Sequence, residues 1–166
     1  MSIKKFDELL ESYDSPVNIN WTAFDGKLVG IFLVRGVQYQ ISCLDKGYGV
    51  WTYKFYVCNS ESNELSPNLT NNDVGKLSIL STIRDGMKYL IETKNPKSVI
   101  FGAFDKSEGR KKLYWRYSEE LKNEYDFKLL TKNRDDKQIF ILYKQIEIDD
   151  LLKIIDVIVS DVINEI

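Results

Sequence analysis

Alternating apolar and polar side chains run through the first half of the chain. The segments "KLVGIFLV" and "VQYQISCL" flank Arg35-Gly36, and the same period continues over residues 51–58. A period of two is typical of β-strands, and a short connection that contains glycine is typical of a hairpin. Together with the earlier segment "VNINWTAF", these runs predict an antiparallel meander of strands.

The period changes to that of a helix after Val74. Apolar side chains then recur every three or four positions, at Leu77, Ile79, Leu80, Ile83, Met87, Leu90 and Ile91. This stripe predicts a long helix, with Asp73 as its N-cap. The polar residues 59–73, which precede the helix, predict a loop.

Strands and helices alternate in the second half of the chain. Residues 97–104 form a short apolar run of the buried-strand type, residues 106–125 a helical pattern, and residues 126–132 and 137–144 two more strands. A strand, a helix and a strand in this order favour a parallel crossover. We therefore expect a single domain of the α/β (α+β) class, in which a mixed, mostly antiparallel sheet is flanked by helices.

Amphipathic segments stand at both ends of the chain. The segment "IKKFDELLESY" predicts a short N-terminal helix, which we assign with the rest of residues 1–146 to one domain. Residues 147–166 predict a C-terminal helix whose apolar side chains are spaced alternately by four and three positions.

Six side chains of this C-terminal helix form an expected interface. They are Ile148, Leu152, Ile155, Val159, Val162 and Ile166. Burying each of them contributes about 1.5–3 kcal/mol, so the stripe will not stay in water. We expect it to pack on its own domain, on a partner protein or on a second copy of the chain.

Composition and charge limit the possible functions. The chain has 166 residues, of which 43% are hydrophobic and 29% charged, as is typical of one soluble globular domain. The net charge of −2 provides no basic field, so nucleic-acid binding is not expected. No apolar run follows the first lysines, and charges interrupt the C-terminal stripe, so we expect a cytoplasmic protein without a membrane span.

The absence of histidine excludes whole classes of chemistry. Ser-His and Cys-His nucleophilic catalysis, histidine bases and zinc sites with imidazole ligands are all ruled out, and no metal site is predicted. The two cysteines, Cys43 and Cys58, lack CxxC spacing and are predicted to be free thiols. Any chemistry must use Asp, Glu, Lys, Tyr, Ser, Cys or the backbone.

The helix over residues 106–125 carries the candidate chemistry. At 100° per residue, Arg110 falls near the middle of the buried face, Tyr114 at its edge, and Trp115 on the opposite side. A buried guanidinium needs an acceptor, so Arg110 is expected to form a structural ion pair or to hold an anion. Tyr114 is the candidate general acid.

Several short segments together resemble a known family. "SILSTIRDGMKYLI", "VIFGAF", "EGRKKLYWRY" and "YDFKLL" are similar to the GNAT acyltransferase fold, and more narrowly to GNAT-like proteins encoded in bacteriophage genomes. The resemblance covers roughly residues 17–145. It implies that Tyr114 would protonate the departing thiolate of coenzyme A, and that Asn72, Gly75 and Lys76 would form the cofactor loop.

The cofactor loop departs from the pattern of the family. Enzymes of this fold bind pyrophosphate with a loop of the form Q/R-x-x-G-x-G/A, whereas "NDVGKL" puts Asn72 first and Leu77 where a minimal side chain is needed. Asp73 adds a negative charge where an anion should bind. The preceding strand, "WTYKFYV", has no carboxylate to act as a general base.

These departures give three functional hypotheses. The first is a non-enzymatic bacteriophage or prophage accessory or assembly protein without a cofactor, which acts through protein contacts in the host cytoplasm or in the virion. The alternative is an acyl-coenzyme A dependent N-acyltransferase that uses acetyl-coenzyme A with an atypical loop. A third is a small inhibitor of a host or phage protein.

Overall fold

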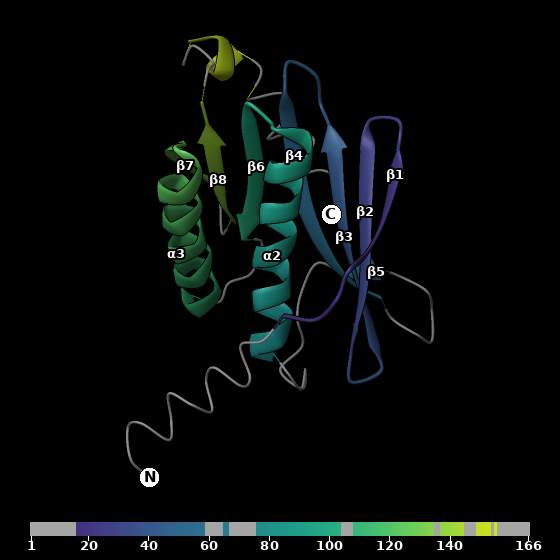
Figure 1. The fold of residues 1–166 in the computed structure, drawn as a ribbon. Helices are drawn as coiled ribbons and strands as arrows, with labels where there is room; N and C mark the ends of the chain where they lie inside the picture. The colour runs from purple at the N-terminus through teal and green to yellow at the C-terminus, as the bar shows by residue number, and fades with distance from the viewer. Residues whose placement is uncertain are drawn as a thin grey trace.

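The computed structural model describes residues 16–58, 65–66, 76–103, 108–134, 137–144, 149–153 and 155. These residues form one sheet, with two helices lying against the same face of it (Figure 1). The predicted single α/β domain is therefore confirmed. The predicted N-terminal helix lies outside the described residues.

The sheet is mixed and mostly antiparallel, as predicted. Its strand order is β1-β2-β3-β4-β6-β8-β7, with β5 paired to β4, and only the β4–β6 pair is parallel. The strands are β1 (Asn20–Phe24), β2 (Lys27–Val34), β3 (Val37–Asp45), β4 (Val50–Cys58), β5 (Leu65–Ser66), β6 (Ser98–Ala103), β7 (Lys128–Arg134) and β8 (Lys137–Tyr143). The short β5 lies within the segment predicted to be a loop, which is a correction to that prediction.

The hairpin between β2 and β3 is built on Arg35 and Gly36. Both residues have positive φ, 51° and 82°, and the flanking Val34 and Val37 are paired. Two positive φ angles match the right-handed twist of the strands, and glycine accepts this conformation without a steric penalty. The register that follows turns Leu28 and Phe32 toward the helices, where both are buried.

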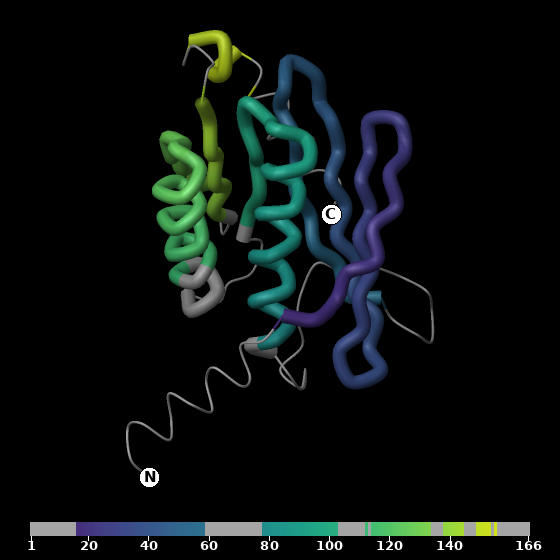
Figure 2. The backbone as a smooth tube through the Cα atoms, viewed as in Figure 1, coloured from purple at the N-terminus to yellow at the C-terminus, as the bar shows by residue number. Residues whose placement is uncertain are grey.

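The two helices follow the two parallel strands. α2 (Lys76–Lys94) comes after β4, and α3 (Glu108–Tyr125) comes after β6. The helices therefore run side by side in the same direction, with both N-termini at one end of the sheet (Figures 1 and 2). α2 packs over β2 and β3, and α3 over β6, β8 and β7. Neither of these described helices is long and apolar enough to cross a membrane.

The core between the helices and the sheet matches the predicted stripe. Ile79, Ile83, Met87 and Leu90 of α2 are buried against the sheet, as their spacing requires. Both cysteines are free, as predicted: Cys43 is buried in this core and Cys58 is half-buried. Burial raises the pKa of the Cys43 thiol well above its ordinary value, so this thiol stays protonated.

A second, smaller core lies on the other face of the sheet. Residues 149–153 are helical, and Leu151 and Ile155 pack there on a set of buried strand residues. This set comprises Val50, Ile100, Ile139 and Ile141. The described part of the C-terminal segment therefore packs on the sheet of its own domain.

The expected interface of the C-terminal helix is described only in part. Ile148, Val159, Val162 and Ile166 lie outside the described residues. Ile155 is completely buried within the domain, whereas Leu152 is 40% exposed. Contact of the stripe with a partner or with a second copy stays a prediction.

Candidate active site

The parallel strands β4 and β6 separate after three pairs of residues. Val50 pairs with Ser98, Trp51 with Val99, and Thr52 with Ile100. Beyond this point β6 continues to its end paired with β8, and β4 continues paired with β3.

This separation leaves part of one strand edge open. β5 pairs with β4 only at Val57 and Cys58, so within the described chain residues 53–56 have no strand partner on the edge toward β6. We call this opening, between residues 53–56 of β4 and 101–103 of β6, the fork. Backbone groups along such an edge are available to a ligand that can form hydrogen bonds with them.

The fork lies where an α/β sheet commonly binds a ligand. It opens at the carboxyl ends of the parallel strands, and the N-termini of both α2 and α3 lie at the same end of the sheet (Figure 1). Ligands of open α/β sheets bind outside the carboxyl ends of strands, and helix N-termini favour negative charge there.

Tyr114 of α3 lies over one arm of the fork. Its ring packs in a T-shaped arrangement with the rings of Phe101 and Phe140, at centre-to-centre distances of 6.2 Å and 6.4 Å. Phe101 is the first residue of β6 beyond the last residue that pairs with β4. Tyr114 is only 7% exposed. The sequence predicted Tyr114 at the edge of the buried face of the helix, whereas the structure places it within that face.

The physical reason is the direction in which α3 packs. Tyr114, Tyr117, Ser118 and Leu121 are all buried, so the inward stripe is centred on these positions. The helical wheel had been centred on Arg110, whose side chain lies outside the described part of the structure. Trp115, predicted to lie on the side opposite the buried face, is exposed at 45%, and the centre of its ring lies 6.4 Å from that of Phe140.

Tyr53 of β4 is the first residue of the other arm. Its hydroxyl donates a hydrogen bond of 2.7 Å to the carbonyl oxygen of Ile83 in α2. Burial, and then the nearby Cys43 and Tyr114, raise the pKa of Tyr53 well above its ordinary value. Sequence reasoning treated Tyr53 only as an apolar strand residue and missed this role.

A glycine inside α2 makes room for the Tyr53 hydroxyl. A Cβ at Gly86 would collide with Tyr53 Oη and would approach Ile41 Cδ1 to 2.7 Å. Glycine in a helix interior costs about 1 kcal/mol relative to alanine, so its presence in α2 was a signal of a close approach.

Gly86→Ala is expected to lower the free energy of unfolding by about 2 kcal/mol, because an overpacked core must move Tyr53 away from Ile83. Urea unfolding measures this loss. In a Tyr53→Phe background the colliding oxygen is absent and only the collision with Ile41 Cδ1 remains, so the same substitution should cost less. Equal losses in the two backgrounds would contradict this contact.

Trp51 does not obstruct the fork. It belongs to the paired end of β4, and its ring lies 5.8 Å from Lys94 Nζ, at the last turn of α2. The side chain of Leu77, the other residue able to fill the site, is not among those described. The aromatic residues on the two arms are Tyr53, Phe55, Tyr56 and Phe101, and Tyr114 of α3 packs on the last of these.

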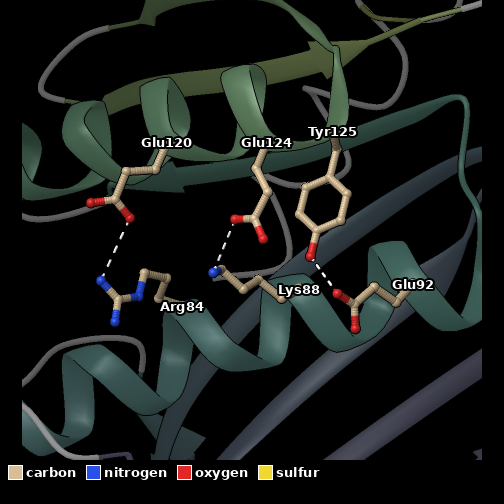
Figure 3. A network of polar contacts seen from close by, with 6 residues as sticks. All are labelled: Arg84, Lys88, Glu92, Glu120, Glu124 and Tyr125. Atoms are coloured by element: carbon tan, nitrogen blue, oxygen red, sulfur yellow. Dashed lines mark hydrogen bonds and ion pairs between the residues drawn. The ribbon is translucent and has the colours of Figure 1, made fainter.

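A row of polar contacts joins α2 to α3 (Figure 3). Arg84 pairs with Glu120 at 3.5 Å and Lys88 with Glu124 at 3.0 Å, and Tyr125 donates a hydrogen bond of 2.6 Å to Glu92. Burial and this hydrogen bond raise the pKa of Tyr125. The spacing of four between Arg84, Lys88 and Glu92 was the available signal for this row, which sequence reasoning missed.

Arg84 also has an unused donor in this seam between the helices. Its guanidinium lies 5.6 Å from the centre of the Tyr117 ring. Its Nε is buried, and no residue in the described parts of the chain accepts a hydrogen bond from it. A buried donor without a partner is costly, which makes Arg84 a candidate contact for a bound carbonyl or anion.

The remaining predicted site residues are described only in part. Asn72 and Gly75 lie outside the described residues. Lys76 is the first residue of α2 and Arg110 lies in the first turn of α3, but their side chains are not described. The expected roles of these four residues stay predictions. β4 contains no Asp or Glu, so it supplies no carboxylate to the fork.

Comparisons with known proteins add one kind of similarity. No protein-family model matches the chain, and no curated protein matches its sequence. Among solved structures, a spermidine N-acetyltransferase SpeG variant from Vibrio cholerae matches with a TM-score of 0.44 and 7% identity, over 86% of this chain and 75% of that one. Campylobacter jejuni N-acetyltransferase PseH with acetyl coenzyme A matches with a TM-score of 0.42 and 12% identity, over 86% and 77%.

The similar structures share the GNAT-like arrangement expected from the sequence. Their TM-scores lie below 0.5 and their identities below 25%, so the likeness concerns strands and helices and carries no activity to this chain. The proteins named here come from bacteria, so the expected bacteriophage origin stays a prediction.

The first functional hypothesis requires a correction. The proteins named above are N-acetyltransferases, and none is a non-enzymatic phage assembly protein, so that hypothesis is not retained. The hypothesis of no cofactor rested on the loop around Gly75, which lies outside the described residues. The fork depends on the pairing of β4 and β6 and not on that loop, and the PseH structure holds acetyl coenzyme A.

Proposed function

We propose that the protein is an acyl-coenzyme A dependent N-acyltransferase. The fork carries this proposal: β4 and β6 part after Thr52 and Ile100, and a buried tyrosine of α3 packs on Phe101, the first residue of the open arm of β6. A tyrosine at this place can act as a general acid in acyl transfer.

The described residues fit an acyl-coenzyme A in two respects. The edge of β4 between Thr52 and Val57 has no strand partner in the described chain, and the pantetheine arm of coenzyme A carries amides that can pair with such an edge. Arg84 Nε, buried in the seam between α2 and α3, supplies a further donor without a partner in the described structure. Residues 53–56 and Arg84 would therefore hold the arm.

When bound, acetyl-coenzyme A supplies a thioester whose carbonyl carbon accepts an amine nitrogen, so that a C–N bond forms and the C–S bond breaks. Tyr114 Oη holds a proton for the sulfur that leaves, and takes a proton back from solvent afterwards. The aromatic rings of Phe101 and Phe140, which flank Tyr114, exclude water from its ring. The low polarity of these surroundings favours the neutral, proton-bearing phenol.

The acceptor amine must reach the fork in its neutral form. No carboxylate lies on β4, so the excess proton of the amine is expected to pass to solvent. The rate of transfer should therefore rise with pH until the amine is largely unprotonated. Cysteine chemistry is not involved, because Cys43 is buried and held as a thiol.

Calorimetric titration with acetyl-coenzyme A tests the proposal directly. We expect binding at micromolar concentrations, followed by acetylation of at least one member of a panel of diamines, amino acids, amino sugars and peptide N-termini, detected by mass spectrometry. Desulfo-coenzyme A, which lacks the thiol but keeps the amides, should bind as well. A flat titration at millimolar acetyl-coenzyme A would overturn the proposal.

A further inference from the structure

The hydrogen bond between Tyr53 and Ile83 lies at the point where the two arms of the fork begin. Tyr53 and Phe101 directly follow the last pair of the parallel ladder, Thr52 and Ile100, so they start the two arms of the fork on the face toward the helices. Tyr114 packs on Phe101 from α3, and Tyr53, Phe101 and Tyr114 all belong to the core between the helices and the sheet. The two phenols thus belong to one cluster that spans the fork.

The hydroxyl of Tyr53 is fixed in direction. Its proton points to the Ile83 carbonyl at 2.7 Å, and the bond is buried. The hydroxyl oxygen therefore presents its lone pairs to its other neighbours and can accept but not donate there. The absence of a side chain at Gly86 lets α2 approach closely enough for this bond.

We propose that Tyr53 is a positioning residue for Tyr114: through its bond to Ile83 it ties the first open residue of β4 to α2, and so fixes this arm of the fork beside Phe101, on which Tyr114 packs. This inference rests on the proposed acyltransferase function and adds to it a residue that does not touch the reacting atoms.

The place of this bond supports the role. A hydrogen bond between a strand and a helix at the point where the strands part fixes the width of the opening, and a small shift there costs much in rate. Removal of the Tyr53 hydroxyl should release the open arm of β4 from α2.

A double-mutant cycle between the two tyrosines tests the proposal. Kinetics with acetyl-coenzyme A and the best amine of the panel are measured for the wild type, Tyr53→Phe, Tyr114→Phe and the double variant. Tyr53→Phe should lower kcat about tenfold, with KM for acetyl-coenzyme A changed less than about twofold. If Tyr53 acts through Tyr114, the double variant should be no slower than Tyr114→Phe alone.

Two further variants separate positioning from a general loss of structure. Gly86→Ala keeps the Tyr53 hydroxyl but moves it from Ile83, and should reproduce the loss in kcat. Tyr125→Phe is the matched control, because it also removes a hydroxyl that bridges α2 and α3, the one bound to Glu92, and should leave kcat unchanged.

A measurement without the acyl donor completes the test. With 3-fluorotyrosine at position 114, the fluorine chemical shift reports the surroundings of that ring. It should change in Tyr53→Phe and stay in place in Tyr125→Phe. An unchanged chemical shift in Tyr53→Phe overturns the inference.

The kinetic outcomes also distinguish the two proposals. If the wild type is active but the losses from the two tyrosines add, Tyr53 does not act through Tyr114, while the proposed function stands. A wild-type protein that transfers no acetyl group to any amine overturns both.

Discussion

Tyr114→Phe is expected to lower kcat for acetyl transfer by about 100-fold or more, while the melting temperature changes by only a few degrees. The substitution removes the hydroxyl proton and keeps the ring that packs on Phe101 and Phe140. Because the proton is needed only when the sulfur leaves, KM for acetyl-coenzyme A should change little. Steady-state kinetics and thermal unfolding of the same preparations provide the two measurements.

Tyr117→Phe is the matched control for this prediction. Tyr117 lies one turn further along the same inward face of α3 and is equally buried, at 3% exposed against 7% for Tyr114. It lies beyond the residues that start the fork, so kcat should be preserved. Losses of similar size in the two variants would mean that a general disturbance of α3 is responsible, and would remove Tyr114 from the role of acid.

Leu151→Ala is expected to lower the free energy of unfolding by about 3 kcal/mol. Leu151 is completely buried on the second face of the sheet, where it packs with Ile155 on the strands β4, β6 and β8. Truncation removes three carbons and leaves a cavity that the rigid sheet cannot close. Urea unfolding in the purified protein measures the loss.

Leu152→Ala is the control from the adjacent position. Leu152 is 40% exposed, and a substitution at such a site usually changes stability by less than about 0.5 kcal/mol. A small loss at both positions would show that the turn over residues 149–153 does not pack on the sheet in solution. A change in oligomeric state with Leu152→Ala alone would instead support the predicted interface.

The fold could be predicted from sequence because its signals are local. The strand β2 was predicted residue for residue, from its apolar run and from the two-residue connection with glycine that follows it. α2 was predicted from the spacing of its apolar side chains, and the parallel pair from the order of the elements. The small strand β5 was missed, because two polar-flanked residues carry no periodicity of their own.

The candidate site was predicted less completely. Tyr114 was identified as a candidate acid from its place on the helix, but it was predicted at the edge of the buried face and is in fact buried. Tyr53 and Arg84 were missed because their roles depend on a carbonyl of α2 and on a carboxylate of α3, which are far away in the sequence. A contact between two polar groups that are distant in the chain produces no periodic pattern in the sequence.

The sequence by itself determined the elements, their order and the excluded chemistry. Hydrophobic periodicity specifies which face of each element is buried, and the absence of histidine removes whole mechanisms regardless of the fold. Only the tertiary structure decided that β4 and β6 part after three pairs, that Tyr53 bonds to α2 at that point and that Tyr114 packs on Phe101 there. Strand pairing and side-chain contacts arise from the packing of distant segments, so the periodicity of any one segment could not specify them.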